Sequence, residues 1–172
     1  EDYRLVGIDA SGLELRMLAH YLNDEGYTNE ILNGDIHTAN QNLAGLESRD
    51  QAKTFIYALL YGAGDAKLGS VVGRGRAHGK GLRQRFFDGL PSFKNLTDRV
   101  QGEAKSGFLK ALDGRRLTVR SEHAALNTLL QGAGAIVMKK ALVILNDKII
   151  KHGWDAPLDG DYKVGENWSE TH

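Results

Sequence analysis

The sequence predicts an α+β fold, built mainly from helices with a few short strands. Three observations predict it: an apolar run at residues 3–8, helical periodicities over 49–61 and 124–151, and an Asp-Gly pair at 113–114 between two apolar runs. Glycine is abundant, with 21 residues, and proline is scarce, with two, which favours helices separated by flexible turns. The 172 residues suffice for one domain with a sizeable core or for two small lobes.

The N-terminal half is predicted to alternate regular elements with polar turns. Its elements are a buried strand over residues 3–8, a helix from Ser11 to Leu22, a loop at 33–35, and helices over 36–44 and 49–61. We expect Ser11 to cap the first helix, because Glu14 three residues later completes the pattern of a capping box.

The C-terminal half is predicted to end in a long helix. Its segments are a glycine-punctuated stretch over 62–82, a helix over 92–105, a hairpin with a strand at 115–119, a helix over 124–151, and a polar tail from 157 to 172. The long helix should stop at His152-Gly153, because glycine readily adopts the left-handed conformation that ends helices.

Composition excludes several classes of protein. Hydrophobic residues make up 41% of the chain and charged residues 26%, as in globular proteins rather than disordered ones. The absence of cysteine excludes disulfides, cysteine-ligated zinc and thiol nucleophiles, and suits a reducing cytoplasm. No stretch approaches the ~18 apolar residues that a membrane span needs, so we expect no membrane partner.

The formal net charge is zero, but the charges are unevenly distributed along the chain. Residues 1–48 hold two basic and nine acidic residues, a sum of −7, whereas residues 49–120 hold fifteen basic and six acidic residues, a sum of +9. The remaining residues sum to −2. A basic middle beside an acidic start suits a polyanion-binding surface that faces a metal site, although solvated charges also cluster by chance.

A stripe of two cations and two aromatic rings is predicted on the helix over 49–61. Its members, Arg49, Lys53, Tyr57 and Tyr61, recur at steps of four, which confines them to an arc of about 120° spread over ~18 Å. Guanidinium and ammonium groups suit triphosphate oxygens, and flat rings suit a base. The alternative is core packing for the tyrosines and a solvated face for the cations.

Asp9 is a candidate magnesium ligand, because it stands at the carboxyl end of the predicted strand. Mg²⁺ prefers oxygen ligands, and the backbone carbonyl of Ala10 offers a second one. The alternative is that Asp9 caps the following helix, just as Glu14 has its own explanation in the capping box.

A third polar set opens the long helix. Arg120 is followed by His123, Asn127 and Gln131, and the last three again step by four along one helical face. Such side chains suit hydrogen bonds to the acceptors of the DNA minor groove, although an ordinary polar helix face looks the same.

These segments together resemble the family A DNA polymerases, related to DNA polymerase I, in the form found in T-odd phages. Residues 6–16 (VGIDASGLELR) resemble motif A of that family, and residues 49–64, beginning RDQAKTFIY, resemble motif B. Three further segments match the same group: 33–38 (NGDIHT), 124–131 and 164–168 (VGENW). The resemblance covers nearly the whole chain.

The resemblance implies a polymerase palm with an antiparallel sheet, and a helical fingers subdomain that closes over a nucleotide. It implies a DNA-directed DNA polymerase in the host cytoplasm, acting on primer-template DNA and dNTPs with two Mg²⁺ ions. Asp9 would hold the metals with the Ala10 carbonyl, and Asp9 and Lys53 would be the catalytic residues. Arg49 and Lys53 would bind the phosphates, with His37 nearby.

The resemblance also implies contacts to the base, the sugar and the DNA. Tyr57 would stack at the nucleotide and, with Glu14, exclude a ribose 2′-hydroxyl, while Tyr61 would lie near the templating base. Asn127, Gln131 and His123 would read the minor groove of the primer-template. By this comparison residues 1–32 belong to the palm, 33–110 to the fingers and 111–172 to the palm again.

One expected motif is missing from the sequence. The family places its second metal-binding carboxylate in a His-Asp pair, and no histidine in this chain precedes an aspartate. The family pattern breaks at Ala156–Pro157, where a few dozen residues are absent, so we expect an incomplete right-hand fold. Because one aspartate cannot position two metal ions, the alternative function is an inactive nucleotide- and DNA-binding remnant.

Overall fold

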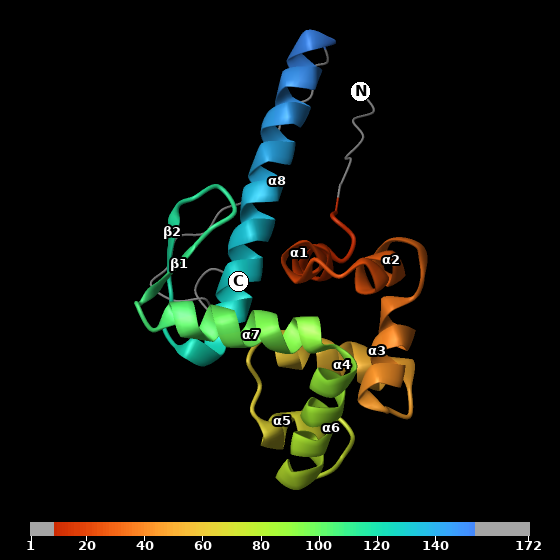
Figure 1. Ribbon diagram of the computed structural model, residues 1–172. Helices are drawn as coiled ribbons and strands as arrows, with labels where there is room; N and C mark the ends of the chain where they lie inside the picture. The colour runs from red at the N-terminus through yellow and green to blue at the C-terminus, as the bar shows by residue number, and fades with distance from the viewer. Residues whose placement is uncertain (1–8, 154–172) are drawn as a thin grey trace. The chain divides into compact units, whose positions relative to one another are not determined.

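The computed structural model describes residues 9–153, which are mainly helical (Figure 1). In chain order the elements are α1 (Leu13–Leu22), α2 (Glu25–Asn33), α3 (Ile36–Ala44), α4 (Arg49–Leu60), α5 (Asp65–Ser70), α6 (Arg76–Gly89), α7 (Pro91–Ala104), β1 (Phe108–Lys110), β2 (Arg116–Thr118), the 3-10 helix η1 (Glu122–Ala124) and α8 (Ala125–Lys151). The chain forms two compact units, one that ends at Ile136 and one that begins at Val137.

The predicted hairpin is confirmed. β1 and β2 pair antiparallel, with Leu109 opposite Leu117, and Gly114 in the connecting turn has a left-handed φ of 88°. Within residues 9–153 these are the only strands. The strand predicted over 3–8 lies outside the described residues. The α+β class is therefore confirmed, with helices far in excess of strands.

Aromatic side chains form the centre of the first unit's core. Phe55 of α4, Phe86 of α6 and Phe93 of α7 are at most 1% exposed. The Phe86 ring meets the other two edge-on, with centroid distances of 5.7 Å to Phe55 and 5.3 Å to Phe93. Because such edge-to-face contacts are directional, they fix how α4, α6 and α7 pack against one another.

The start of α1 differs from the prediction. Gly12, not Ser11, is the N-cap residue, and it has a left-handed φ of 60° with no side-chain cap. The capping box was wrong because glycine takes this conformation without strain, so the chain enters the helix one residue later than expected. Ser11 instead accepts a hydrogen bond from Arg16 Nε at its carbonyl oxygen, and Glu14 remains free for contacts elsewhere.

Three helices were not predicted. α2 fills a segment that the sequence left unassigned, α5 forms inside the glycine-punctuated stretch, and α6 forms inside and beyond it. Low helix propensity argued against α6, but packing against α5 overrides it. A Cβ at Gly79 would collide with the backbone of Asp65 and Gly69, so this glycine permits the close approach of the two helices.

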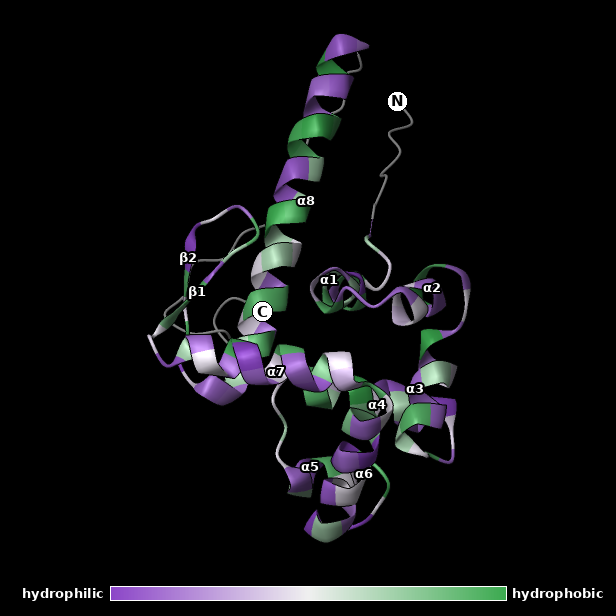
Figure 2. Ribbon diagram, viewed as in Figure 1, coloured by the Kyte–Doolittle hydropathy of each residue, from purple (hydrophilic) through white to green (hydrophobic). Residues whose placement is uncertain are grey.

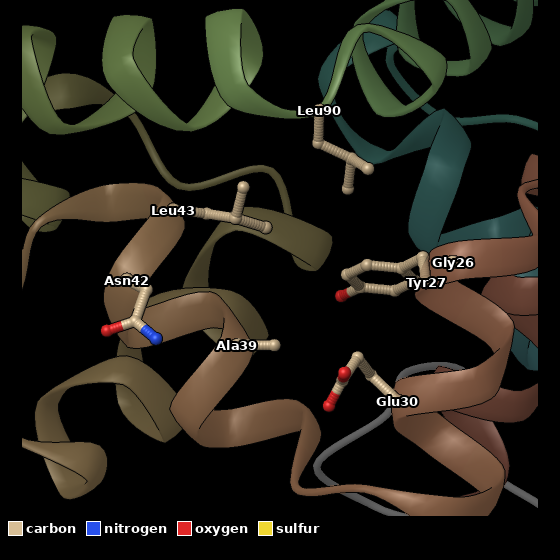
Figure 3. A pocket seen from close by; sticks show the side chains of 7 residues that line it. All are labelled: Gly26, Tyr27, Glu30, Ala39, Asn42, Leu43 and Leu90. Atoms are coloured by element: carbon tan, nitrogen blue, oxygen red, sulfur yellow. The ribbon is translucent and has the colours of Figure 1, made fainter.

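α3 is held against α2 by a buried polar contact beside a groove. Tyr27 Oη of α2 donates a hydrogen bond of 3.0 Å to Asn40 Oδ1 of α3, and both residues are buried. Figure 3 shows the Tyr27 phenol at one wall of the groove, with Leu43 and Leu90 beside it. This contact sets the position of α3, whose first residues reach the functional site.

α8 ends where the sequence predicted, with Gly153 at a φ of 64°. In the first unit its apolar residues Leu126, Leu130 and Ala133 are buried in the core. Figure 2 shows that hydrophobic residues continue along the helix, and beyond Ile136 Leu142, Val143, Ile144 and Ile150 are exposed.

Among the described residues, one segment is long and apolar enough to cross a membrane. It runs from Glu122 to Lys151, and 28% of its apolar window is buried. The expectation of no membrane partner, which counted uninterrupted apolar residues rather than mean hydropathy, stays a prediction. This is weak evidence for a membrane span, since a core helix of a soluble protein meets the same criterion.

Alanine substitutions at two glycines of α6 should change the free energy of unfolding in opposite directions. Gly79→Ala should lower the free energy of unfolding by about 1–3 kcal/mol, because the new methyl collides with the α5 backbone. Gly81→Ala should raise it by about 0.5–1 kcal/mol, because this glycine is exposed inside the helix with nothing within 4 Å of a Cβ. Urea unfolding measures both, and equal effects would contradict the assigned α5–α6 packing.

Candidate functional site

α4 separates an apolar face from the stripe of cations and rings. Its residues Phe55, Ile56 and Leu59 are buried in the core. Of the stripe, Arg49, Lys53 and Tyr61 are exposed and Tyr57 is half-buried, with Tyr61 as the C-cap residue just beyond the helix. The Tyr57 and Tyr61 rings lie 6.3 Å apart and are tilted by 40°. The stripe therefore offers two cations at its beginning and two adjacent rings at its end.

Arg49 is paired with Asp35, the N-cap residue of α3. Arg49 Nε and Nη2 donate hydrogen bonds of 2.6 and 3.1 Å to the two carboxylate oxygens. The same carboxylate accepts hydrogen bonds from the His37 backbone N–H and the Thr38 hydroxyl. The hydrogen bond from the Arg49 guanidinium, above all, holds the pKa of Asp35 far below its ordinary value.

His37 lies near Tyr57 and is influenced electrostatically by both cations of the stripe. Its ring centroid is 6.4 Å from that of Tyr57. Burial lowers the pKa of His37, and the nearby charges of Arg49 and Lys53 lower it further, more than Asp35 raises it. His37 is therefore neutral at pH 7, and its buried Nδ1 has no hydrogen-bond partner among the described residues.

Glu14 links the stripe to the start of α8. Its Oε1 accepts a hydrogen bond of 3.3 Å from Gln131 Nε2. Burial raises the pKa of Tyr57 and of Tyr61, and in both cases the negative charge of Glu14 is the next cause. Glu14 therefore bonds to Gln131 and acts electrostatically on both rings, which joins the predicted stripe and the predicted polar set of α8.

His123 of the polar set lies against the turn that follows α4. Arg120 and His123 are exposed before α8, Asn127 is half-buried and Gln131 is exposed. Gly62, with a φ of 77°, follows the stripe directly, and a Cβ there would collide with the His123 carbonyl oxygen. The turn after Tyr61 therefore packs on η1, and only glycine fits this position.

Arg83 of α6 supports the same turn, which sequence analysis missed. Its Nη2 donates a hydrogen bond of 2.6 Å to the Ala63 carbonyl, and its Nε lies 2.9 Å from Asp65 Oδ1. Asp35 was likewise not predicted as a functional residue. The sequence could have indicated Asp35 as the N-cap of α3, with Thr38 three residues later. No local sequence pattern indicates its pairing with Arg49.

Both residues of the predicted metal site lie at the start of the described part of the chain. Asp9 is exposed and Ala10 is half-buried, just before α1. Within residues 9–153 no three histidine or acidic side chains lie close enough together to hold a metal ion. A carboxylate and a carbonyl fit a single Mg²⁺ ion that shares its other ligands with phosphate and water, but not a pair of ions.

Comparison with known proteins identifies the family. The family model described as DNA polymerase family A matches residues 1–160. The chain belongs to this family. The DNA-directed DNA polymerases of Enterobacteria phage T3 and Escherichia phage T7 are each 50% identical to it over 171 aligned positions, which cover 87% of this chain and 24% of each relative. The chain thus spans about a quarter of the length of these relatives, and the predicted resemblance is confirmed.

Two further comparisons agree. The DNA-directed DNA polymerase of Escherichia phage Phieco32 is 46% identical over 243 aligned positions, which cover 97% of this chain and 40% of the relative. The solved POL domain of Pol1 from M. smegmatis, in complex with DNA primer-template and dNTP, has a TM-score of 0.76 and 25% identity, covering 84% of this chain and 30% of that one.

The Phieco32 alignment is longer than the chain itself. Its 243 positions against the 172 residues of this chain leave at least 71 positions where the relative has residues and this chain has none. The predicted loss of an internal segment itself stays a prediction, because the alignment length does not locate these positions along the chain. The predicted junction at Ala156–Pro157 lies outside the described residues, so its position stays a prediction.

Replacing Arg49 should raise the pKa of Asp35. In Arg49→Ala the carboxylate loses its main stabilising partner, so its pKa should move up toward the ordinary value near 4. In the unmodified chain, stability from this pair is present above that ordinary value and is lost as pH falls through the depressed pKa. Carbon-detected NMR titration of the Asp35 carboxyl measures the change, and an unchanged pKa would contradict the pairing.

Proposed function

We propose that this chain forms part of the palm and fingers of a DNA-directed DNA polymerase and binds an incoming dNTP against primer-template DNA. The observation that carries the proposal is the stripe on α4, with its cations beside His37 and its rings beside Glu14. Family membership and the Pol1 neighbour, solved with primer-template and dNTP, support it. The reaction served is transfer of a nucleotidyl group to a primer 3′ end with release of pyrophosphate.

The cationic end of the stripe binds the triphosphate in this proposal. Arg49 and Lys53 are exposed and lie one turn apart, so both reach the same ligand. The free edge of the guanidinium suits bidentate contact with phosphate oxygens, while the ammonium acts as a point charge. His37, neutral at pH 7, contributes a hydrogen bond rather than a charge.

The aromatic end of the stripe binds the nucleoside. Tyr57, half-buried and fixed by its neighbours, stacks at the nucleotide, and Glu14 limits the space at the sugar, so that together they exclude a ribose 2′-hydroxyl. Tyr61 is more exposed, at 51%, and is assigned to the templating base. The electrostatic interaction of Glu14 with both tyrosines supports this assignment.

The polar set around η1 and the start of α8 is assigned to DNA. Arg120 meets the backbone, and His123, Asn127 and Gln131 meet the minor groove of the primer-template. This division places residues 33–110 in the fingers and the flanking residues in the palm. The hydrogen bond from Gln131 to Glu14 supports it, because it connects the DNA-binding face with the nucleotide site.

Asp9 and the Ala10 carbonyl are assigned to one Mg²⁺ ion, which would arrive with the triphosphate and neutralise part of its charge. Asp9 and Lys53 are the chain's proposed catalytic residues. The sequence has no His-Asp pair, and within residues 9–153 no three histidine or acidic side chains lie close enough together to hold a metal ion. These observations favour a second candidate function, an inactive remnant that binds nucleotide and DNA.

Lys53→Ala should weaken binding of Mg²⁺·dTTP by about tenfold or more, because it removes a charged hydrogen-bond donor from the triphosphate. Asn127→Ala should change this affinity little, since Asn127 faces DNA. Lys67→Ala, which removes the same charge from the neighbouring α5, is the control for net charge. Calorimetric titration measures all three, and equal weakening would contradict the assignment of the stripe.

Primer extension separates the two candidate functions. Because the 172 residues contain no His-Asp motif, we expect little or no Mg²⁺-dependent extension by this chain alone, alongside measurable dTTP binding. Robust synthesis from a primed template would contradict the expected loss of activity. Absence of any nucleotide binding would contradict both candidate functions.

A further inference from the structure

Only one edge of the Arg49 guanidinium is occupied by Asp35. The two hydrogen bonds use Nε and Nη2, which form the side edge of the planar group. A guanidinium has five N–H donors, so Nη1 and the second hydrogen of Nη2 remain available. Nothing else among the described residues bonds to Arg49, and its side chain is 51% exposed. The edge of the guanidinium formed by Nη1 and Nη2 is therefore open to a ligand while Asp35 stays bound at the other edge.

Asp35 is itself firmly held. Its Oδ1 accepts a hydrogen bond of 3.1 Å from His37 N, and its Oδ2 accepts one of 2.9 Å from the Thr38 hydroxyl. The carboxylate is thus anchored to the first turn of α3, which is fixed in turn by the buried Tyr27–Asn40 hydrogen bond. An anchored acceptor restricts a long side chain that would otherwise sample many rotamers.

We propose that Asp35 is a positioning residue, which fixes the Arg49 fork so that its open edge meets the triphosphate. The proposal rests on the proposed nucleotide site. It assigns Asp35 a function that acts through Arg49 and not through contact with the ligand. Because the depressed pKa of Asp35 keeps the carboxylate ionised at neutral and mildly acidic pH, its hydrogen bonds with Arg49 persist over that range.

Two effects of Asp35 on anion binding have opposite signs. Its negative charge repels a triphosphate, so removing that charge alone would tighten binding. Its hydrogen bonds orient Arg49, so removing them weakens binding. The structure favours orientation, because the two hydrogen bonds have charge-assisted, bidentate geometry and Arg49 leaves the second edge free.

Asp35→Asn separates these effects. Asparagine caps helices as well as aspartate does, so α3 is retained, while the bidentate acceptor for Arg49 is lost. We expect Mg²⁺·dTTP to bind about tenfold more weakly, the size of effect typical of a hydrogen bond to a charged group. Binding of thymidine, which has no phosphate, should not change.

Asp50→Asn is the matched control. Asp50 follows Arg49 in the first turn of α4 and influences it through charge, but it makes no hydrogen bond to it. This variant loses the same charge as Asp35→Asn, and it should bind dTTP as tightly as the unmodified chain or slightly more tightly. If Asp35→Asn weakens dTTP binding and Asp50→Asn does not, the weakening results from the lost orientation of Arg49 and not from the lost charge.

The double variant tests whether Asp35 acts through Arg49. In an Arg49→Ala background, Asp35→Asn should no longer weaken dTTP binding. Tighter binding by Asp35→Asn, or equal weakening of thymidine and dTTP, would overturn the proposal while leaving the nucleotide site intact. If Lys53→Ala also fails to weaken dTTP binding, the proposed site itself is wrong.

Discussion

Burial of one face of α4 determines where the functional side chains of the other face stand. Phe55 and Ile56 have no exposed surface, and Phe55 packs edge-on against Phe86. The helix cannot rotate about its axis without exposing these residues to water, at roughly 1.5–3 kcal/mol for each large apolar side chain. The hydrophobic core thereby fixes the direction in which Arg49, Lys53 and Tyr57 project.

The two ends of the stripe are supported by different elements. At the cationic end α3 supplies an anchored carboxylate and a half-buried histidine. At the aromatic end α1 supplies Glu14, while Gly62 lets the chain pass close to η1 and Arg83 holds the carbonyl of Ala63. Residues distant in sequence therefore support both ends, which is how a flexible set of long side chains becomes a defined surface.

Local patterns predicted α4, the hairpin and the end of α8, because each depends on periodicity or on a turn residue. The predictions from local pattern were wrong at the start of α1, where the N-cap residue is Gly12 and not Ser11. They also missed α6, where packing with α5 overrides the low helix propensity of glycine. The stripe was predictable from its step of four. The pairing of Asp35 with Arg49 was not, because it joins two helices whose relative placement depends on the tertiary fold.

Amide chemical-shift mapping of the labelled chain with Mg²⁺·dTTP shows most directly whether α4 presents a nucleotide-binding surface. We expect saturable shifts concentrated over residues 49–61 and at His37 and Glu14, with little change in the hairpin of β1 and β2. Saturable shifts confined to the hairpin or to α6 and α7, or no saturable shifts at any concentration, would contradict it.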